Sequence, residues 1–215
     1  NGRRIKSMDL VLLFPIPVYF NDLNLPNEDV NFVVEQDYIR TDAQNGFLTL
    51  NKHILNTPQL KNLKEKIHKH IQIFMYEKLK VSPKMKFKIL NSWGLKHVKG
   101  DYALPHSHTN SLISGIVYLK TLKKGGKLIF HKNKMWENIF PRCIWAEYTE
   151  YNSITSEDFT VAPKPGAIIL FPSSLNHSVT QNQSDENRYS LSFNIYTEAD
   201  LGLQKNIDEL SIRVT

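Results

Sequence analysis

The second half of the sequence alternates apolar and polar residues with a period of two, and this alternation constrains the fold more than any other feature. The first such segment runs from Met85 to Trp93, where apolar or aromatic residues take most odd positions. Successive side chains of an extended chain point to opposite faces, so each segment predicts a half-buried strand. Similar segments follow at 112–120, 127–130, 159–162, 167–171, 178–181 and 188–196. Turn-forming residues separate them, which favours a β-sandwich or barrel.

The first part of the chain has helical character instead. Thr57 is a good N-cap residue and precedes Pro58, which would take the first helical position. Apolar residues then recur at helical spacing, namely Leu60, Leu63, Ile67, Ile71, Phe74 and Leu79. Weaker helical character surrounds 27–38, and the apolar stretch 10–20, interrupted by two prolines, predicts an extended edge strand. Helices followed by a run of strands indicate an α+β fold.

The length of 215 residues suits one domain. We take residues 1–7 as a leader before a native start at Met8, and 8–215 as a single domain. Within it, we expect 8–84 to form mainly helical support and 85–197 to form the β core. The segment 131–158 is aromatic-rich and poorly periodic, and it fits either an insert or lid beside the site or a satellite apolar cluster.

Charge and cysteine content argue against several classes of protein. The net charge of +6 falls to 6 − 3 = +3 without the three cations of residues 1–7. So small a surplus argues against a nucleic-acid partner. Cys143 is the single cysteine, which excludes an internal disulfide framework and a thiolate zinc site. The apolar stretch 10–20 is too short to span a membrane, so we predict a soluble, cytoplasmic protein.

Three histidines and an arginine carry the chemistry that the sequence suggests. His106 and His108 are two residues apart on a predicted extended segment, so both can face one cavity. His177, from a distant strand, would complete a facial set of three ligands with open positions, as in non-haem Fe(II) oxygenases. Further along, Arg188 and Ser190 point the same way on a strand. An arginine fork beside a hydroxyl suits bidentate recognition of the distal carboxylate of a dicarboxylate.

Four segments together resemble a known family. They read LFPIPVYF, NSWGLKHVKGDYALPHSHTNSLISGIVYLK, PKPGAIILFPSSLNHSV and NRYSLSFN. They are similar to a bacterial and phage group of the Fe(II)/2-oxoglutarate-dependent dioxygenase superfamily, related to prolyl-4-hydroxylase-like enzymes, over about 8–197. The resemblance implies a double-stranded β-helix, a jelly-roll or cupin-like barrel, with supporting N-terminal helices. It also implies a hydroxylase that uses Fe(II), 2-oxoglutarate and dioxygen and releases succinate and CO2.

The resemblance also assigns roles to residues of this chain. His106 and His177 would be iron ligands, and Arg188 would hold the C5 carboxylate of 2-oxoglutarate with help from Ser190. Four further residues would form the pocket wall beside the cosubstrate, namely Tyr118, Ser114, Asn91 and Trp93.

One position departs from the family pattern. Most relatives have Asp or Glu two residues after the first histidine, and this chain has His108 there. Either His108 is a third neutral ligand, or a water takes that coordination position, or the motif is shifted to begin at His108 with Asn110 following. We favour the three-histidine site.

Two other functions remain open at this stage. A cupin-type metalloenzyme without 2-oxoglutarate would use the histidines but leaves Arg188 without a role. A non-enzymatic basic module would bind nucleic acid through the lysine-rich helix 61–80, but such binding needs a basic face with exposed aromatics or a known motif, and the sequence indicates neither. For the oxygenase, kinship suggests a prolyl or other protein side chain as substrate, and a small molecule is the alternative. Two extended proline-bearing segments would allow a homodimer.

Overall fold

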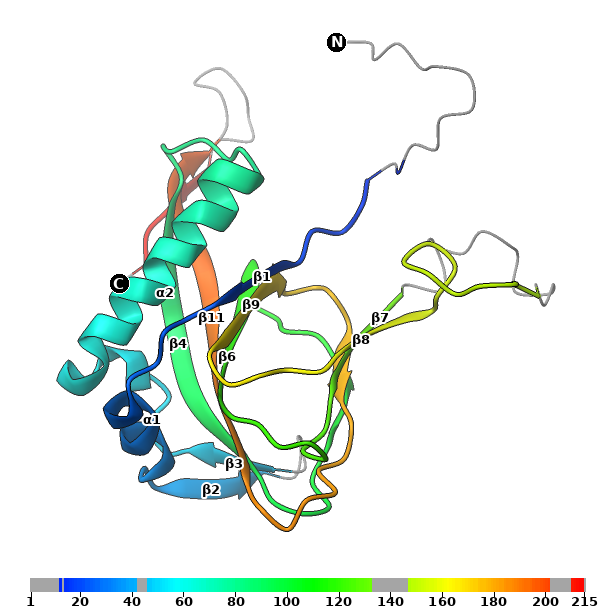
Figure 1. Cartoon of the computed structure of the whole chain (residues 1–215). Coiled ribbons are helices and arrows are strands. Elements are labelled where there is room, and N and C mark those ends of the chain that lie inside the picture. The colour runs from blue at the N-terminus through cyan, green and yellow to red at the C-terminus, as the bar shows by residue number, and fades with distance from the viewer. Residues whose placement is uncertain (1–11, 13, 42–45, 133–146, 202–209, 215) are drawn as a thin grey trace.

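Two antiparallel β-sheets face each other and enclose a barrel (Figure 1). The computed structural model describes residues 12, 14–41, 46–132, 147–201 and 210–214. The larger sheet has the strand order β1 (Tyr19–Asp22), β9 (Ala167–Pro172), β6 (Ile113–Lys120), β11 (Arg188–Leu201), β4 (Lys86–His97), β3 (Gly46–Thr49) and β2 (Tyr38–Thr41), and β12 (Leu210–Ile212) pairs with β11. The smaller sheet has the order β5 (Ala103–His106), β10 (His177–Val179), β7 (Leu128–His131) and β8 (Asp158–Val161).

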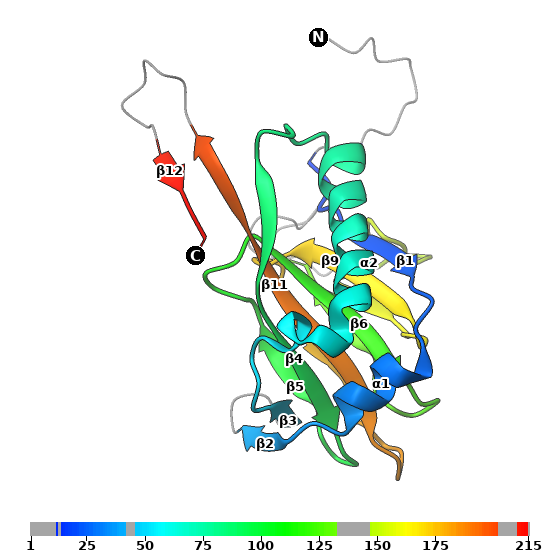
Figure 2. The ribbon, with the colours of Figure 1, turned by 90° about the vertical axis from the view of Figure 1, so that its left-hand side faces the viewer.

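Helices cover the outer face of the larger sheet (Figure 2). They are α1 (Asn27–Val34) and α2 (Lys61–Gln72); α2 is preceded by the short turns η1 (Ile54–Asn56) and η2 (Pro58–Leu60) and continued by the π-helical turn η3 (Ile73–Lys78). Leu63 and Ile67 of α2 are fully buried in one cluster with Val117 of β6 and Phe193 of β11. Burial of this apolar stripe explains why the helical spacing in the sequence is so regular.

The period-two pattern of β6 separates this outer core from the barrel interior. Val117 faces the helices, whereas Ile116 and Tyr118 belong to a second buried cluster between the sheets, together with Phe130 and Phe171. Because β6 is buried on both faces, its sequence is almost continuously apolar. The α+β class and the double-stranded β-helix expected from the sequence are therefore confirmed.

The N-terminal part differs from its prediction in two respects. It is less helical than expected, because β1, β2 and β3 all join the larger sheet. Thr57 does not cap α2: its hydroxyl donates to the Ile54 carbonyl at 2.7 Å, and a 3-10 turn over Pro58–Leu60 precedes the helix. The proposed leader 1–7 and the part 133–146 of the proposed insert lie outside the described residues.

Among the described residues, no helix combines the length and the apolar character that a membrane span requires.

Candidate active site

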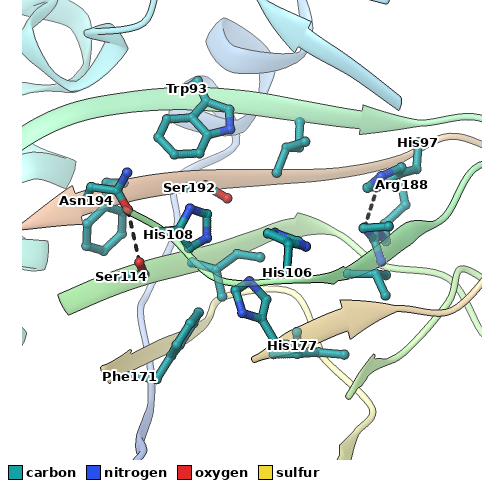
Figure 3. Close-up of a pocket in the computed structure, with 17 residues that line it drawn as sticks. Trp93, His97, His106, His108, Ser114, Phe171, His177, Arg188, Ser192 and Asn194 are labelled. Atoms are coloured by element: carbon teal, nitrogen blue, oxygen red, sulfur yellow. Dashed lines mark hydrogen bonds between the residues drawn. The ribbon is translucent and has the colours of Figure 1, made fainter. Parts of the chain in front are cut away.

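The three predicted histidines meet inside the barrel (Figure 3). His106 ends β5 and lies directly opposite His177 of β10 in the antiparallel ladder. The ring centroids of His106 and His177 are 4.4 Å apart, and His108 lies 5.1 Å from His177 and 5.3 Å from His106. One ligand nitrogen from each ring lies within 4.8 Å of the others, which is close enough for all three to bind one metal ion.

Backbone carbonyls orient two of these rings. The Nδ1 atoms of His106 and His177 lie 2.7 Å and 2.9 Å from the carbonyl oxygens two residues earlier, those of Leu104 and Leu175. Each Nδ1 therefore carries the proton and donates, which leaves Nε2 as the metal-binding nitrogen. His108 is placed differently, since its backbone N–H donates to the Ser173 carbonyl at 2.9 Å.

The environment keeps the imidazoles of His108 and His177 neutral, as metal ligation requires. Burial, with a smaller contribution from the neighbouring histidines, lowers the pKa of His177 to about 3, although the hydrogen bond to the Leu175 carbonyl acts in the opposite direction. Burial also lowers the pKa of His108 to about 4, with a contribution from His106. Three imidazoles converging on one point suit a divalent iron ion, so the donor set fits the metal of the implied family.

A buried arginine lies at the other end of the same cavity. Arg188 is 2% exposed and pairs through Nη2 with Nδ1 of His97, its cross-strand neighbour on β4. Its Nε and Nη1 atoms are buried and have no hydrogen-bond partner, and no carboxylate pairs with it among the described residues. Burial lowers the pKa of Arg188, yet a guanidinium stays charged. A buried, unpaired cation is costly, so this end of the cavity is built for an anion.

Two hydroxyls near Arg188 are also buried without partners. They belong to Tyr118 of β6 and Ser190 of β11, which lie opposite each other in the ladder. Burial raises the pKa of Tyr118 to about 12, while Arg188 acts in the opposite direction, so the phenol remains a neutral donor. Unsatisfied donors beside an unpaired guanidinium fit a carboxylate, which accepts several hydrogen bonds.

Of the four predicted wall residues, two line the cavity: Trp93 and Ser114. Asn91 and Tyr118 are not part of the lining that the described residues form. The sequence reasoning missed His97, Phe171 and Asn194, which do line it. Strand alternation could have indicated Asn194, because residues 188, 190, 192 and 194 share one face of β11, whereas the contact between His97 and Arg188 depends on the register of two strands.

A double-stranded β-helix with three converging histidines and a buried arginine that has no acidic partner among the described residues is the arrangement of a class of metal-dependent oxygenases. A family model described as "Putative 2OG-Fe(II) oxygenase" matches residues 91–194, which include every residue of this site. Over these 104 of the 215 residues the chain is similar to this family, and the matching cofactor and cosubstrate are Fe(II) and 2-oxoglutarate, which the histidines and the buried arginine fit. This assignment replaces the cupin-type and basic-module alternatives.

Solved structures show the same fold at low sequence identity. An oxidoreductase of the 2OG-Fe(II) oxygenase family from Burkholderia pseudomallei is 11% identical, with a TM-score of 0.56 over 83% of this chain and 84% of its own. A prolyl-4-hydroxylase from Pseudomonas putida is 12% identical, with a TM-score of 0.55 over 83% and 92%. HygX from Streptomyces hygroscopicus, solved with nickel, 2-oxoglutarate and hygromycin B, is 13% identical, with a TM-score of 0.56 over 84% and 82%. No curated protein sequence matches the chain.

Proposed function

We propose that this oxygenase hydroxylates a C–H bond of its substrate and converts 2-oxoglutarate to succinate and CO2, with His106, His108 and His177 holding Fe(II). The observation that carries this proposal is the pairing, in one cavity, of three converging imidazoles with a buried arginine that has no acidic partner among the described residues. The arginine has no structural role that would explain its burial, because its Nε and Nη1 atoms are left unsatisfied.

In this proposal, residues at different places along the cavity have different roles in the reaction. When bound, Fe(II) with 2-oxoglutarate and dioxygen supplies the oxidising power for breaking the C–H bond. Arg188 would bind the C5 carboxylate as a two-pronged donor, and Tyr118 and Ser190 would donate to the same group. His97 would hold the guanidinium in place. Trp93 and Phe171 form apolar wall beside the histidines and would exclude water from the reacting centre.

For the substrate, we propose a prolyl or other protein side chain as the first class to test. A prolyl-4-hydroxylase among the structural neighbours supports this choice. HygX, which was solved with hygromycin B bound, makes small molecules the second class.

The test is succinate formation from 2-oxoglutarate by protein loaded anaerobically with Fe(II) and then exposed to dioxygen. We expect the wild type to form succinate, slowly without substrate and faster with a substrate present. His177→Ala should abolish the reaction because it removes a ligand. Arg188→Ala should chiefly raise the 2-oxoglutarate KM, since it removes a charge-assisted contact. Absence of succinate from iron-loaded wild type under all these conditions would contradict the proposal.

A further inference from the structure

The indole nitrogen of Trp93 is a buried hydrogen-bond donor without a partner in the cavity wall. Trp93 is 8% exposed and lines the cavity, and its Nε1 atom is buried with no hydrogen-bond partner. An indole N–H can only donate. A buried N–H without an acceptor is costly, because it has lost its hydrogen bonds to water and gained none in return. The partner that Trp93 lacks in the protein is therefore expected to be an oxygen of a bound molecule.

Asn194 adds a second donor to the same part of the cavity. It lines the cavity two residues along β11 from Ser192, which is the cross-strand partner of Trp93. Its Oδ1 atom accepts a hydrogen bond from Ser114 Oγ at 3.0 Å, drawn as a dashed line in Figure 3. The protein thus occupies the carbonyl end of the amide, and the NH2 end points away from Ser114, to the side of Trp93 (Figure 3). This NH2 group has no hydrogen-bond partner among the described residues.

The charges around the cavity favour an acceptor over a cation. No carboxylate lines the cavity among the described residues, and its ionisable lining residues are four histidines and Arg188. A cationic substrate group would therefore meet no counter-charge there. An acceptor oxygen, in contrast, would meet the N–H donors of Trp93 and Asn194.

The two donors lie away from the site of the cosubstrate carboxylate. Trp93 is four residues from His97 on β4, and Asn194 is six residues from Arg188 on β11, which corresponds to about 13 Å and about 20 Å along the paired strands. The terminal oxygens of 2-oxoglutarate are six bonds apart, as many bonds as two residues of extended chain, or about 7 Å. The Trp93 ring lies 6.4 Å from the ring of His108, measured between centroids. A cosubstrate held at Arg188 therefore ends near the histidines, and the donors are left for the substrate.

We infer that Trp93 and Asn194 are specificity-determining residues: their N–H groups donate to a carbonyl oxygen that the substrate carries near the carbon that reacts. The inference rests on the proposed function, because it takes this end of the cavity as the substrate site. A substrate without such an oxygen would leave the buried indole N–H unpaired, and this penalty is the source of the discrimination. A peptide backbone carries a carbonyl oxygen in every residue, so the inference fits the first substrate class proposed above.

The first test observes the indole N–H of Trp93 directly. The chain has three tryptophans, so Trp93→Phe identifies the Trp93 indole signal in the 1H–15N spectrum of full-length protein loaded with Zn(II) and 2-oxoglutarate. Cyclopentanone is a neutral ketone without a donor, and in methylenecyclopentane a CH2 group replaces its oxygen. We expect cyclopentanone to move the Trp93 indole proton downfield and to shift the NH2 signals of Asn194, whereas methylenecyclopentane should cause no such downfield shift. Absence of the downfield shift with cyclopentanone would overturn the inference.

The second test measures how much the indole donor contributes to binding. Trp93→Phe keeps an aromatic ring and removes the N–H. We expect this variant to bind cyclopentanone about three- to tenfold more weakly than the wild type, as the loss of one neutral hydrogen bond allows, while methylenecyclopentane binds both proteins equally. The backbone amide spectrum of the variant checks that it is folded, and the first test uses the wild type alone for its shifts. Equal affinity of both folded proteins for cyclopentanone would count against the inference.

The same samples separate this inference from the proposed function. Binding of 2-oxoglutarate to the Zn(II)-loaded wild type is measured first, and its absence would contradict the proposed function itself. If 2-oxoglutarate alone moves the Trp93 indole proton downfield, the donor serves the cosubstrate, and only the inference about the substrate fails. Normal 2-oxoglutarate binding without an effect of the ketone oxygen would likewise overturn the role of Trp93 and Asn194 alone.

Discussion

At the scale of single residues, Arg188 is the most informative feature of the molecule. A protein that needed only stability would not bury a guanidinium and leave two of its nitrogens unpaired, because apolar replacements are usually as stable or more so. The arrangement is understandable if the missing partner is a ligand. His97 then holds one side of the guanidinium and leaves the other side for the incoming carboxylate.

Replacing Arg188 by lysine tests this function of the guanidinium. Arg188→Lys keeps the charge but loses the planar fork, so the KM for 2-oxoglutarate should rise about 10- to 100-fold with a smaller change in kcat. The measurement is the initial rate of succinate formation against 2-oxoglutarate concentration. Arg213→Lys, at an exposed position, is the matched control. An unchanged KM in Arg188→Lys would show that the carboxylate binds elsewhere.

The lowered pKa values of two histidines predict how the metal-free protein responds to acid. Unfolded imidazoles have a pKa near 6.5, whereas burial lowers the pKa of His108 to about 4 and that of His177 to about 3. Below pH 6.5 the unfolded chain therefore binds protons that the folded chain excludes. Stability should fall as the pH drops from 6.5 toward 4, by at most about 1.4 kcal/mol per pH unit for each histidine.

Urea unfolding of the metal-free protein across this pH range is the check. His108→Gln removes one titrating group, so its free energy of unfolding should depend less steeply on pH than that of the wild type. Identical pH dependence in both proteins would mean that His108 is not held neutral by burial.

At the scale of elements, close contact between strands explains where glycine is required. A Cβ added to Gly115 of β6 would lie 2.2 Å from two ring atoms of Phe193 on β11 and 2.9 Å from Leu170 on β9. All three residues belong to the outer face of the larger sheet, where the helices pack. The absence of a side chain at Gly115 is what lets the Phe193 ring approach β6 so closely.

Gly115→Ala should therefore be strongly destabilising. Overpacking of a filled core costs about 1–3 kcal/mol, and the shortness of these contacts places the substitution at the upper end. Denaturant unfolding measures the loss, with Thr160→Ala on the exposed strand β8 as the control. A loss below about 0.5 kcal/mol would show that β6 and β11 can separate to make room.

The elements also show how far the sequence could predict the structure. The buried strands β6, β9 and β11 were predicted to within a few residues, except that β11 continues to Leu201, because each carries a clear apolar pattern and ends at turn residues. The short strands β2 and β3 were missed, since four-residue strands with partly exposed side chains have no strong period. Thr57 was wrongly predicted to cap α2. Its hydroxyl donates instead to the Ile54 carbonyl in a local 3-10 turn, which residue propensities do not predict.

At the scale of the whole molecule, one sheet serves two purposes on its two faces. The outer residues of β11, such as Leu191 and Phe193, anchor the helices, while the alternate residues Arg188 and Asn194 face the cavity. Neighbouring residues of the same strand therefore serve the fold and the site, because successive side chains point to opposite faces of the sheet. The histidines could be selected from sequence through their family resemblance, but their convergence depends on the pairing of β5 with β10, which no local pattern reveals.

Because the outer core and the cavity lie on opposite faces of the larger sheet, we expect a substitution that destabilises the outer core to leave binding of 2-oxoglutarate unchanged. Leu63→Ala removes a fully buried side chain from α2 and should cost about 2–5 kcal/mol in unfolding free energy. The 2-oxoglutarate KM of the protein that remains folded should be unchanged, because α2 lies on the far face of the sheet. Glu65→Ala, on the exposed side of the same helix, is the control. A raised KM in Leu63→Ala would mean that the helices also set the geometry of the cavity.

The central claim is that three neutral imidazoles hold the iron, with His108 where relatives carry a carboxylate. Anaerobic calorimetric titration of Fe(II) into wild type, His108→Ala and His108→Asp tests it most directly. We predict at least tenfold weaker binding in His108→Ala, because one ligand is lost, and recovery in His108→Asp, which restores the usual two-histidine, one-carboxylate set. Equal Fe(II) affinity in wild type and His108→Ala would contradict the three-histidine site.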